Sequence, residues 1–334
     1  MKAVLLTSYG DVDQLVFGDT ATPEPGPGEV LLRLHASAVN PFDLYLRQGY
    51  FAEMIPLPLP AILGSDAAGV IAKLGAGVSG WSVGERVVAD FWPNGRGAHA
   101  EYGIVPATSM ARLPDALSFE QGAALVKAGL IGRQTVAALG VETGDRVLVS
   151  GALGSAGRAA VQYLQELGAQ PVAGVRPERL EEARALAGEA IDITIAASNP
   201  GFDFAISAAA PVAGNLISHV RDGGTIASIV PVPEGANATG RVTIRDLIHQ
   251  TEAATMSAVL DAAIRGDLII PITQTFELNQ IGAAHIAVAA GSPGKVVLKH
   301  YSSPQHAAPL DERLSSRKRL GVTSSIFVRV WGMM

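Results

Sequence analysis

A glycine-punctuated turn at residues 151–157 constrains the fold of this chain more than any other feature. Residues 147–149 before the turn are all branched and apolar, and glycines stand at 151, 154 and 157. An apolar period of three and four residues begins at Ala156 and ends before Gly168, where a helix C-terminal cap is expected. This order predicts a strand, a tight turn and a helix whose N-terminal N–H groups and dipole favour an anion. We interpret the turn as a dinucleotide pyrophosphate site, although a glycine turn in any α/β sheet would give the same local pattern.

Residues 118–264 alternate between helical and strand-like patterns. Ser118 and Gln121 have the spacing of a capping box, which predicts a helix from there to Leu139. Short apolar runs separated by helices favour a parallel, doubly wound sheet, with the ligand at the carboxyl ends of its strands. Besides the run before the glycine turn, strands are expected at 172–175, 192–195, 202–206 and 225–229, and helices at 178–187, 212–220 and 245–265.

Residues 1–115 contain many short strand patterns and Gly/Pro turns, which predict a β-rich, barrel-like domain. In residues 30–37, apolar side chains alternate with Arg33 and His35, as in a half-buried antiparallel strand. A closing strand at 295–299 is expected to return to this domain. The other expected strands are 2–6, 67–74, 86–89, 98–105 and 269–276, with a short helix near 280–290.

The charge balance argues against nucleic acid and anionic membranes as partners. The 334 residues have a net charge of −6, and no apolar segment is long enough for a transmembrane helix. Residues 301–334 hold a basic cluster without an amphipathic period, which predicts a disordered tail. The N-terminus reaches Tyr9 and Gly10 too early for a signal peptide, so the cytoplasm is the expected location.

The chain has no cysteine, which excludes disulfides, thiolate catalysis and every zinc site that uses cysteine ligands. Seven further stretches stand in order around the glycine turn, at residues 28–34, 38–43, 46–50, 63–70, 75–78, 83–87 and 293–298. Together they resemble the medium-chain dehydrogenase/reductase superfamily, in particular its zinc-independent quinone oxidoreductase branch. The resemblance covers about residues 1–300, and the tail has no counterpart in it.

The resemblance implies an α/β protein with two domains and an active site between them. A GroES-like domain is expected at residues 1–115, completed by about 265–300, and a Rossmann domain at 116–264. Asn40 stands where the family's zinc enzymes have a ligand cysteine, and Ser65 and Asp66 replace a His-Glu pair. The resemblance therefore implies chemistry without zinc. A homodimer through the edge of the Rossmann sheet is a further expectation.

The expected cofactor is NADPH, with NADH as the less favoured alternative. In this fold an acidic residue after the second strand selects the ribose of NAD, whereas an arginine suits the 2′-phosphate of NADP. Arg176 takes that position and Arg179 adds a second positive charge. Glu178 would select NAD if the turn were one or two residues longer, and both arginines would also suit a solvated helical turn. The expected cofactor-binding residues are Gly151, Ala152, Gly154, Ser155, Ala156, Gly157, Arg176 and Arg179.

The resemblance implies hydride transfer from the nicotinamide to a quinone or an α,β-unsaturated carbonyl. Such an acceptor becomes a stabilised oxyanion, so one hydrogen-bond donor can take the place of zinc. Asn40 and Tyr45 are the catalytic candidates, because both lie on the segment that matches the family's cleft wall. Asn40 before Pro41 also suits a turn, and Tyr45 also suits core packing.

A second hypothesis is a nucleotide-binding redox sensor or partner protein with little turnover. The family often has a threonine close to the nicotinamide where this chain has Ile131, which removes a hydroxyl. Lys127 adds a charge one turn earlier; it would suit a contact with phosphate, but we interpret it as part of a solvated helix face. Titration with the nicotinamide cofactor followed by a panel of acceptors separates the two hypotheses.

Overall fold

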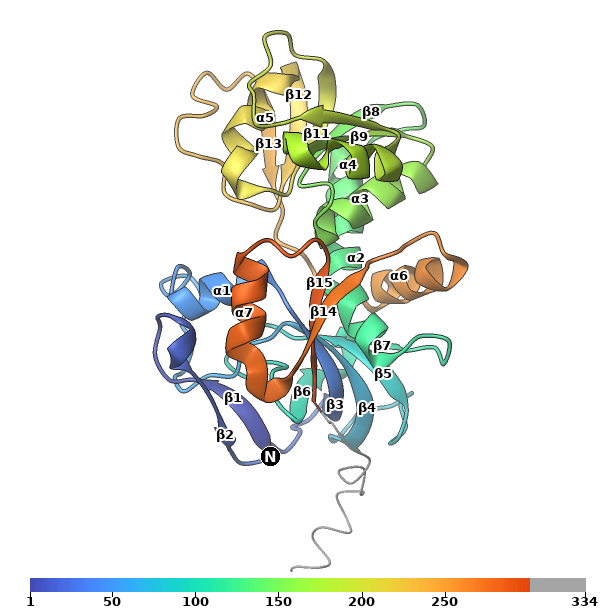
Figure 1. Cartoon of the computed structure of the whole chain (residues 1–334). Helices are drawn as coiled ribbons and strands as arrows, with labels where there is room; N and C mark the ends of the chain where they lie inside the picture. The colour runs from blue at the N-terminus through green and yellow to red at the C-terminus, as the bar shows by residue number, and fades with distance from the viewer. Residues whose placement is uncertain (301–334) are drawn as a thin grey trace, which may run out of the picture.

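The computed structural model describes residues 1–300, which form two lobes stacked end to end (Figure 1). Each lobe is built around one large sheet, and helix α2 (Phe119–Leu139) runs from one lobe into the other. The parallel lobe comprises residues 146–246. The mixed lobe comprises residues 1–112 and 272–299. The predicted tail at 301–334 lies outside the described residues.

The parallel lobe contains a six-stranded sheet in the order β10-β9-β8-β11-β12-β13. Every neighbouring pair of these strands is parallel, so all their carboxyl ends lie at one edge of the sheet. The strands are β8 (Arg146–Ser150), β9 (Gln170–Val175), β10 (Glu189–Asp192), β11 (Phe202–Ser207), β12 (Val220–Ser228) and β13 (Thr243–Asp246), and the helices are α3 (Ser155–Glu166), α4 (Leu180–Ala187) and α5 (Ala213–His219).

Helices cover both faces of this sheet because successive residues of a strand point to opposite faces. Val147 and Val149 of β8 pack in the core cluster that includes α2, α3 and α4. Leu148, between them, packs with Leu216 of α5 on the other face. The α/β, doubly wound parallel architecture predicted from the sequence is confirmed.

The mixed lobe contains a seven-stranded sheet in the order β14-β15-β3-β4-β5-β7, with β6 paired to β3 and a separate β1-β2 pair. The closing strand β15 returns to the lobe of residues 1–112, as predicted, where it pairs antiparallel with β3; the boundaries of the expected domains stay a prediction. The strands are β1 (Lys2–Leu6), β2 (Leu15–Asp19), β3 (Glu29–Val39), β4 (Asp66–Leu74), β5 (Arg86–Asp90), β6 (Tyr102–Pro106), β7 (Met110–Arg112), β14 (Ile272–Glu277) and β15 (Lys295–Lys299), and the helices are α1 (Pro41–Gln48) and α7 (Ile281–Ala289).

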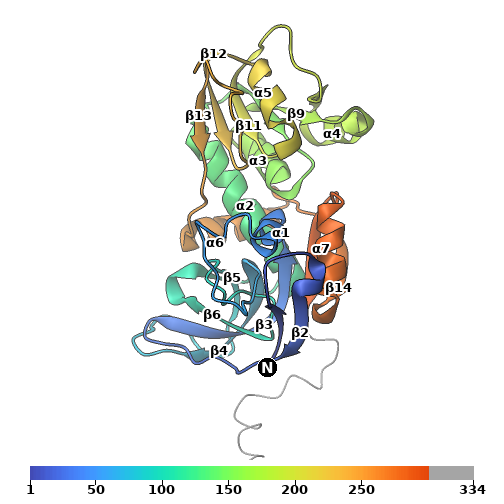
Figure 2. The same cartoon turned by 90° about the vertical axis from the view of Figure 1, so that its left-hand side faces the viewer.

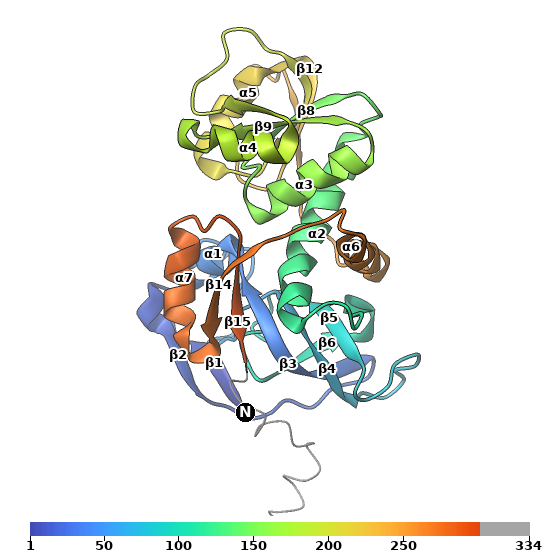
Figure 3. The ribbon, with the colours of Figure 1, turned by 45° about the vertical axis from the view of Figure 1, so that its right-hand side comes forward.

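Helix α2 holds the two lobes together (Figures 2 and 3). It begins at the predicted capping box, where the Gln121 N–H donates to the Ser118 hydroxyl at 3.1 Å. Helix α6 (Ala253–Arg265) lies against it, and a Cβ atom on Gly129 would lie 2.4 Å from the side chain of Val259. One apolar cluster contains residues of both sheets and of α2, so the lobes share a core.

Several predicted elements are wrong in their limits. Residues 245 and 246 end β13, and the helix predicted from 245 begins only at Ala253. Strand β13 is short and mostly exposed, so it lacks the apolar alternation by which a strand is recognised. The strand predicted at 192–195 is Glu189–Asp192, the one predicted at 225–229 is Val220–Ser228, and the one predicted at 98–105 is Tyr102–Pro106. In each case the residues next to the apolar run either lengthen or shorten the strand.

Candidate active site

The glycine turn leaves β8 at the carboxyl edge of the parallel sheet and enters α3 directly. Gly151 has a φ of 67°, which favours glycine, and Gly154 is the N-cap residue of α3. A Cβ atom on Gly157 would lie 2.2 Å from the Gly151 carbonyl oxygen, so only glycine permits this close packing. Ser155 and Ala156 form the first turn of α3, where N–H groups without helical partners point outward. The turn has the geometry of an anion-binding site.

Two arginines follow the neighbouring strand β9. The side chain of Arg176 is 66% exposed, and its Nε lies 3.2 Å from Glu178 Oε1. Arg179 Nε donates to Glu182 at 2.8 Å. Both arginines therefore follow the strand next to the one that leads into the glycine turn, and each has an exposed carboxylate partner that a phosphate would have to displace.

Asn40 is at the start of α1 and is buried, with 8% of its surface exposed. Its Nδ2 donates to Asp66 Oδ1 at 2.8 Å and to Ser65 Oγ at 3.4 Å, and its Oδ1 accepts from Lys295. The Asn40 backbone N–H donates to Asp43 Oδ2 at 2.7 Å. Both N–H groups of the amide thus have acceptors within the protein. We call these five residues the inner cluster.

Burial controls the ionisation of the inner cluster. It raises the pKa of Asp43 to about 6, against the opposing effects of the Asn40 backbone N–H and the lysine charges. Burial also raises the pKa of Asp66, although Lys295 Nζ lies 3.5 Å from its Oδ2. Both carboxyl groups are therefore less readily ionised than in water.

Tyr45 is on α1, and 37% of its surface is exposed. Its ring centroid lies 5.8 Å from that of Tyr50 and 6.3 Å from that of Phe51, in edge-on arrangements. Tyr50 lines a surface hollow of about 360 Å³ together with Gly10, Asp11 and Gln48. Tyr45 is therefore part of an exposed aromatic group rather than of the core.

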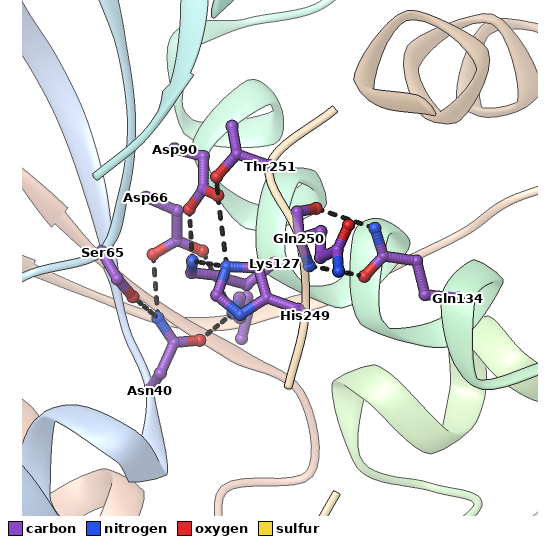
Figure 4. A network of polar contacts seen from close by, with 10 residues as sticks. Asn40, Ser65, Asp66, Asp90, Lys127, Gln134, His249, Gln250 and Thr251 are labelled. Atoms are coloured by element: carbon purple, nitrogen blue, oxygen red, sulfur yellow. Dashed lines mark hydrogen bonds and ion pairs between the residues drawn. The ribbon is translucent and has the colours of Figure 1, made fainter. Parts of the chain in front are cut away.

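Lys127 departs most from its prediction, because it is buried rather than solvated. Its side chain is 7% exposed, and its Nζ contacts Asp90 Oδ1 and His249 Nε2 (Figure 4). His249 Nε2 also lies 3.2 Å from Asp90 Oδ2, which accepts a hydrogen bond from the Thr251 hydroxyl. We call Asp90, Lys127, His249 and Thr251 the junction network.

The junction network joins the two lobes. Asp90 ends β5 in the mixed lobe, Lys127 is on α2, and His249 and Thr251 lie on the segment between β13 and α6. Burial would raise the pKa of Asp90, but its hydrogen bond with His249 and the Lys127 charge hold that pKa below its usual range. Asp90 is therefore an ionised partner for a buried lysine.

The junction network was not predicted from the sequence, since each of its contacts joins residues that are 37 to 161 positions apart. The one signal was Lys127 itself, a lone charge within the apolar run 123–130. Within residues 1–300, no group of three or more histidine, aspartate or glutamate side chains could hold a metal ion. No helix in this part of the chain is long and apolar enough to cross a membrane.

Comparisons with known proteins agree with this architecture. Residues 26–115 match the alcohol dehydrogenase GroES-like domain. The chain is 29% identical over 324 residues to a quinone oxidoreductase of Pseudomonas aeruginosa, covering 86% of this chain and 96% of that protein. The structure of the quinone oxidoreductase from Coxiella burnetii has a TM-score of 0.82 at 26% identity, covering 90% of this chain and 99% of that one. Together these matches support the medium-chain dehydrogenase/reductase superfamily, in its quinone oxidoreductase-like branch, as the family that this chain resembles.

A trans-enoyl reductase of Aspergillus terreus shares higher identity over a shorter region. It is 38% identical over 195 residues, which cover 53% of this chain and 63% of that protein. The chain thus spans less than two thirds of the length of that relative. Together these relatives support an oxidoreductase of the medium-chain family.

Proposed function

We propose that this protein is a zinc-independent, NADPH-dependent oxidoreductase that transfers hydride to a quinone or an α,β-unsaturated carbonyl. The observation that carries the proposal is the glycine turn at the carboxyl edge of the parallel sheet, with Arg176 directly after the neighbouring strand β9. A pyrophosphate fits the N–H groups of α3, and a 2′-phosphate fits the exposed guanidinium of Arg176, with Arg179 beside it. The bound nicotinamide would supply the hydride.

The chain's own residues would bind the acceptor and exclude water. Asn40 and Tyr45 are proposed to line the acceptor site, and the inner cluster holds the Asn40 amide in one orientation. Tyr45 presents an exposed ring against which a planar quinone or enone can stack. The relatives named for quinones and for enoyl substrates support this class of acceptor. A homodimer and a cytoplasmic location stay predictions.

Arg176→Glu tests the cofactor assignment. Replacing the guanidinium by a carboxylate removes charge-assisted hydrogen bonds to the 2′-phosphate, so the Kd for NADPH should rise about 10- to 100-fold. The Kd for NADH, which lacks that phosphate, should change little. Fluorescence titration of both cofactors measures the two constants. Arg221→Glu is the matched control, because Arg221 is also exposed and pairs with a single carboxylate, that of Asp203. Equal weakening of both cofactors by Arg176→Glu would contradict the assignment.

Turnover separates the enzyme from the alternative. NADPH oxidation should be measured with a panel of quinones and α,β-unsaturated carbonyls after the titration. Oxidation that depends on an acceptor supports the proposal. Tight NADPH binding with no oxidation by any acceptor would instead favour the nucleotide-binding redox sensor.

A further inference from the structure

The junction network lies on the far side of the glycine turn from Arg176. In the sheet order, β9 is next to β8, whereas β13 lies three strand spacings beyond β8 on the other side, or about 14 Å. Arg176 follows β9 and His249 follows β13, so both are at the carboxyl edge of the sheet. A dinucleotide with its pyrophosphate at the turn and its 2′-phosphate toward Arg176 would extend its nicotinamide half toward the junction network.

Lys127 has an N–H group available at this end of the site. An ammonium group has three N–H donors, and Lys127 Nζ has two partners among the described residues, Asp90 and His249. Asn40 has no such spare donor, because its amide N–H groups donate to Asp66 and Ser65. Lys127 is therefore the better placed of the two to donate to an acceptor oxygen at the junction.

His249 connects Lys127 to solvent. The His249 side chain is 18% exposed, whereas those of Lys127 and Asp90 are 7% and 1% exposed. Its Nε2 lies within hydrogen-bond distance of both Lys127 Nζ and Asp90 Oδ2, so this nitrogen either donates to Asp90 or accepts from Lys127. An imidazole in that position can pass a proton between water and the buried amine.

We propose that Lys127 is the proton donor of the reaction and that His249 returns the proton from solvent. This inference rests on the proposed function. Hydride transfer brings two electrons and one hydrogen to a carbon of the acceptor and leaves negative charge on its oxygen. A Lys127 N–H bond then breaks as the oxygen–hydrogen bond forms, which gives a neutral amine and the neutral enol of an enone or, from a quinone, a tautomer of the hydroquinone.

The remaining step restores the charge of Lys127. The neutral amine takes the proton from His249 Nε2 while the other ring nitrogen takes one from water. The carboxylate of Asp90, from β5, and the hydroxyl of Thr251 fix the positions of both bases. The charge of Lys127 also offsets part of the rise that burial causes in the pKa of Asp43 and Asp66.

Lys127→Met is the direct test. Loss of the proton donor should lower kcat for NADPH oxidation by about 10²- to 10⁴-fold. It should also remove the fall in kcat on the alkaline side, where a donor loses its proton, and leave the Kd for NADPH unchanged. Because this variant leaves the Asp90 carboxylate buried without its cation, Asp90→Asn/Lys127→Met is made in parallel and should show the same loss. Arg133→Met, which removes an exposed cation from the same helix, should keep wild-type kcat.

His249→Ala tests the return path. Its kcat should fall at least about tenfold and recover when imidazole is added, since a structural role gives no such rescue. Wild-type kcat in the double variant would overturn the inference. A His249→Ala protein whose kcat is normal and does not respond to imidazole would overturn it as well. Both outcomes leave the proposed function intact. Failure of the wild-type protein to oxidise NADPH with any acceptor would instead overturn the proposed function, and the inference with it.

Discussion

The inner cluster and the junction network each pair a buried lysine with a buried aspartate, yet they differ in connection and exposure. The Lys295–Asp66 pair joins β15 to β4 within one lobe, and both side chains are almost fully buried, at 3% and 0% exposed. The Lys127–Asp90 pair joins α2 to β5, and the inter-lobe segment adds His249, which reaches solvent. The first arrangement can only fix positions, whereas the second can also exchange protons with water.

The two clusters also differ in the ionisation of their carboxyl groups. Burial raises the pKa of Asp43 and Asp66 in the inner cluster, but His249 and Lys127 overcome burial at Asp90 and lower its pKa. A buried charge is stable only where enough donors surround it. Two lysine–aspartate pairs in one protein thus have different chemistry because their remaining neighbours differ.

Lys295→Met should have the largest effect on stability. It leaves the Asp66 carboxylate without its cation and the Asn40 Oδ1 without its donor, so the free energy of unfolding should fall by about 3–5 kcal/mol. Chemical denaturation at neutral pH measures the loss. Asp66→Asn/Lys295→Met should recover part of it, since the orphaned charge is gone. A loss for Lys295→Met smaller than that for Lys127→Met would contradict the comparison, because Asp90 keeps His249 and Thr251.

Asp43→Asn should have an effect that depends on pH. The folded protein raises the pKa of Asp43 from 3.8 to about 6, so it binds this proton more tightly than the unfolded chain does. The stabilisation is complete below pH 3.8 and is lost as pH rises through 6. An amide stays neutral throughout this pH range. The free energy of unfolding of the variant, relative to that of the wild-type protein, should therefore rise by up to about 3 kcal/mol across it. Urea denaturation at several pH values measures the difference.

Asp90→Asn is the matched comparison for Asp43→Asn. The folded protein lowers the pKa of Asp90, so the stabilisation from its ionised form is present above the ordinary aspartate range and is lost as pH falls through the folded pKa. The free energy of unfolding of the amide variant, relative to that of the wild-type protein, should therefore fall as pH rises. The same sign for both variants would show that the two clusters do not differ in the way described.

Thr251→Ala should have the smallest effect. It removes the hydroxyl that donates to Asp90 Oδ2. A hydrogen bond to a charged group contributes about 1.5–3 kcal/mol to stability, and water that reaches the segment can replace part of this contribution. We expect a loss near the lower end, measured by denaturation, with Thr251→Ser retaining most of the stability. An unchanged free energy of unfolding for Thr251→Ala would mean that this contact does not hold the segment to β5.

Patterns within short stretches predicted much of the fold. The capping box at Ser118, the glycine turn before α3 and the closing strand β15 are all where local periodicity placed them. Each depends on neighbours within a few residues, because caps, turns and amphipathic faces are local properties. The edge strand β13 was missed because it is short and mostly exposed, so that its pairing with β12, and not an apolar pattern, makes it a strand.

The candidate site likewise contains residues that the sequence predicts and residues that only the tertiary structure brings together. The sequence by itself determined the glycine turn before α3 and the arginine after β9, since both lie in contiguous motifs. Only the tertiary structure decided that Lys127 is buried against Asp90 and His249. That outcome depends on the crossing of α2 between the lobes and on the path of the chain after β13. No local sequence pattern shows which charged side chains the fold will bury in contact with one another.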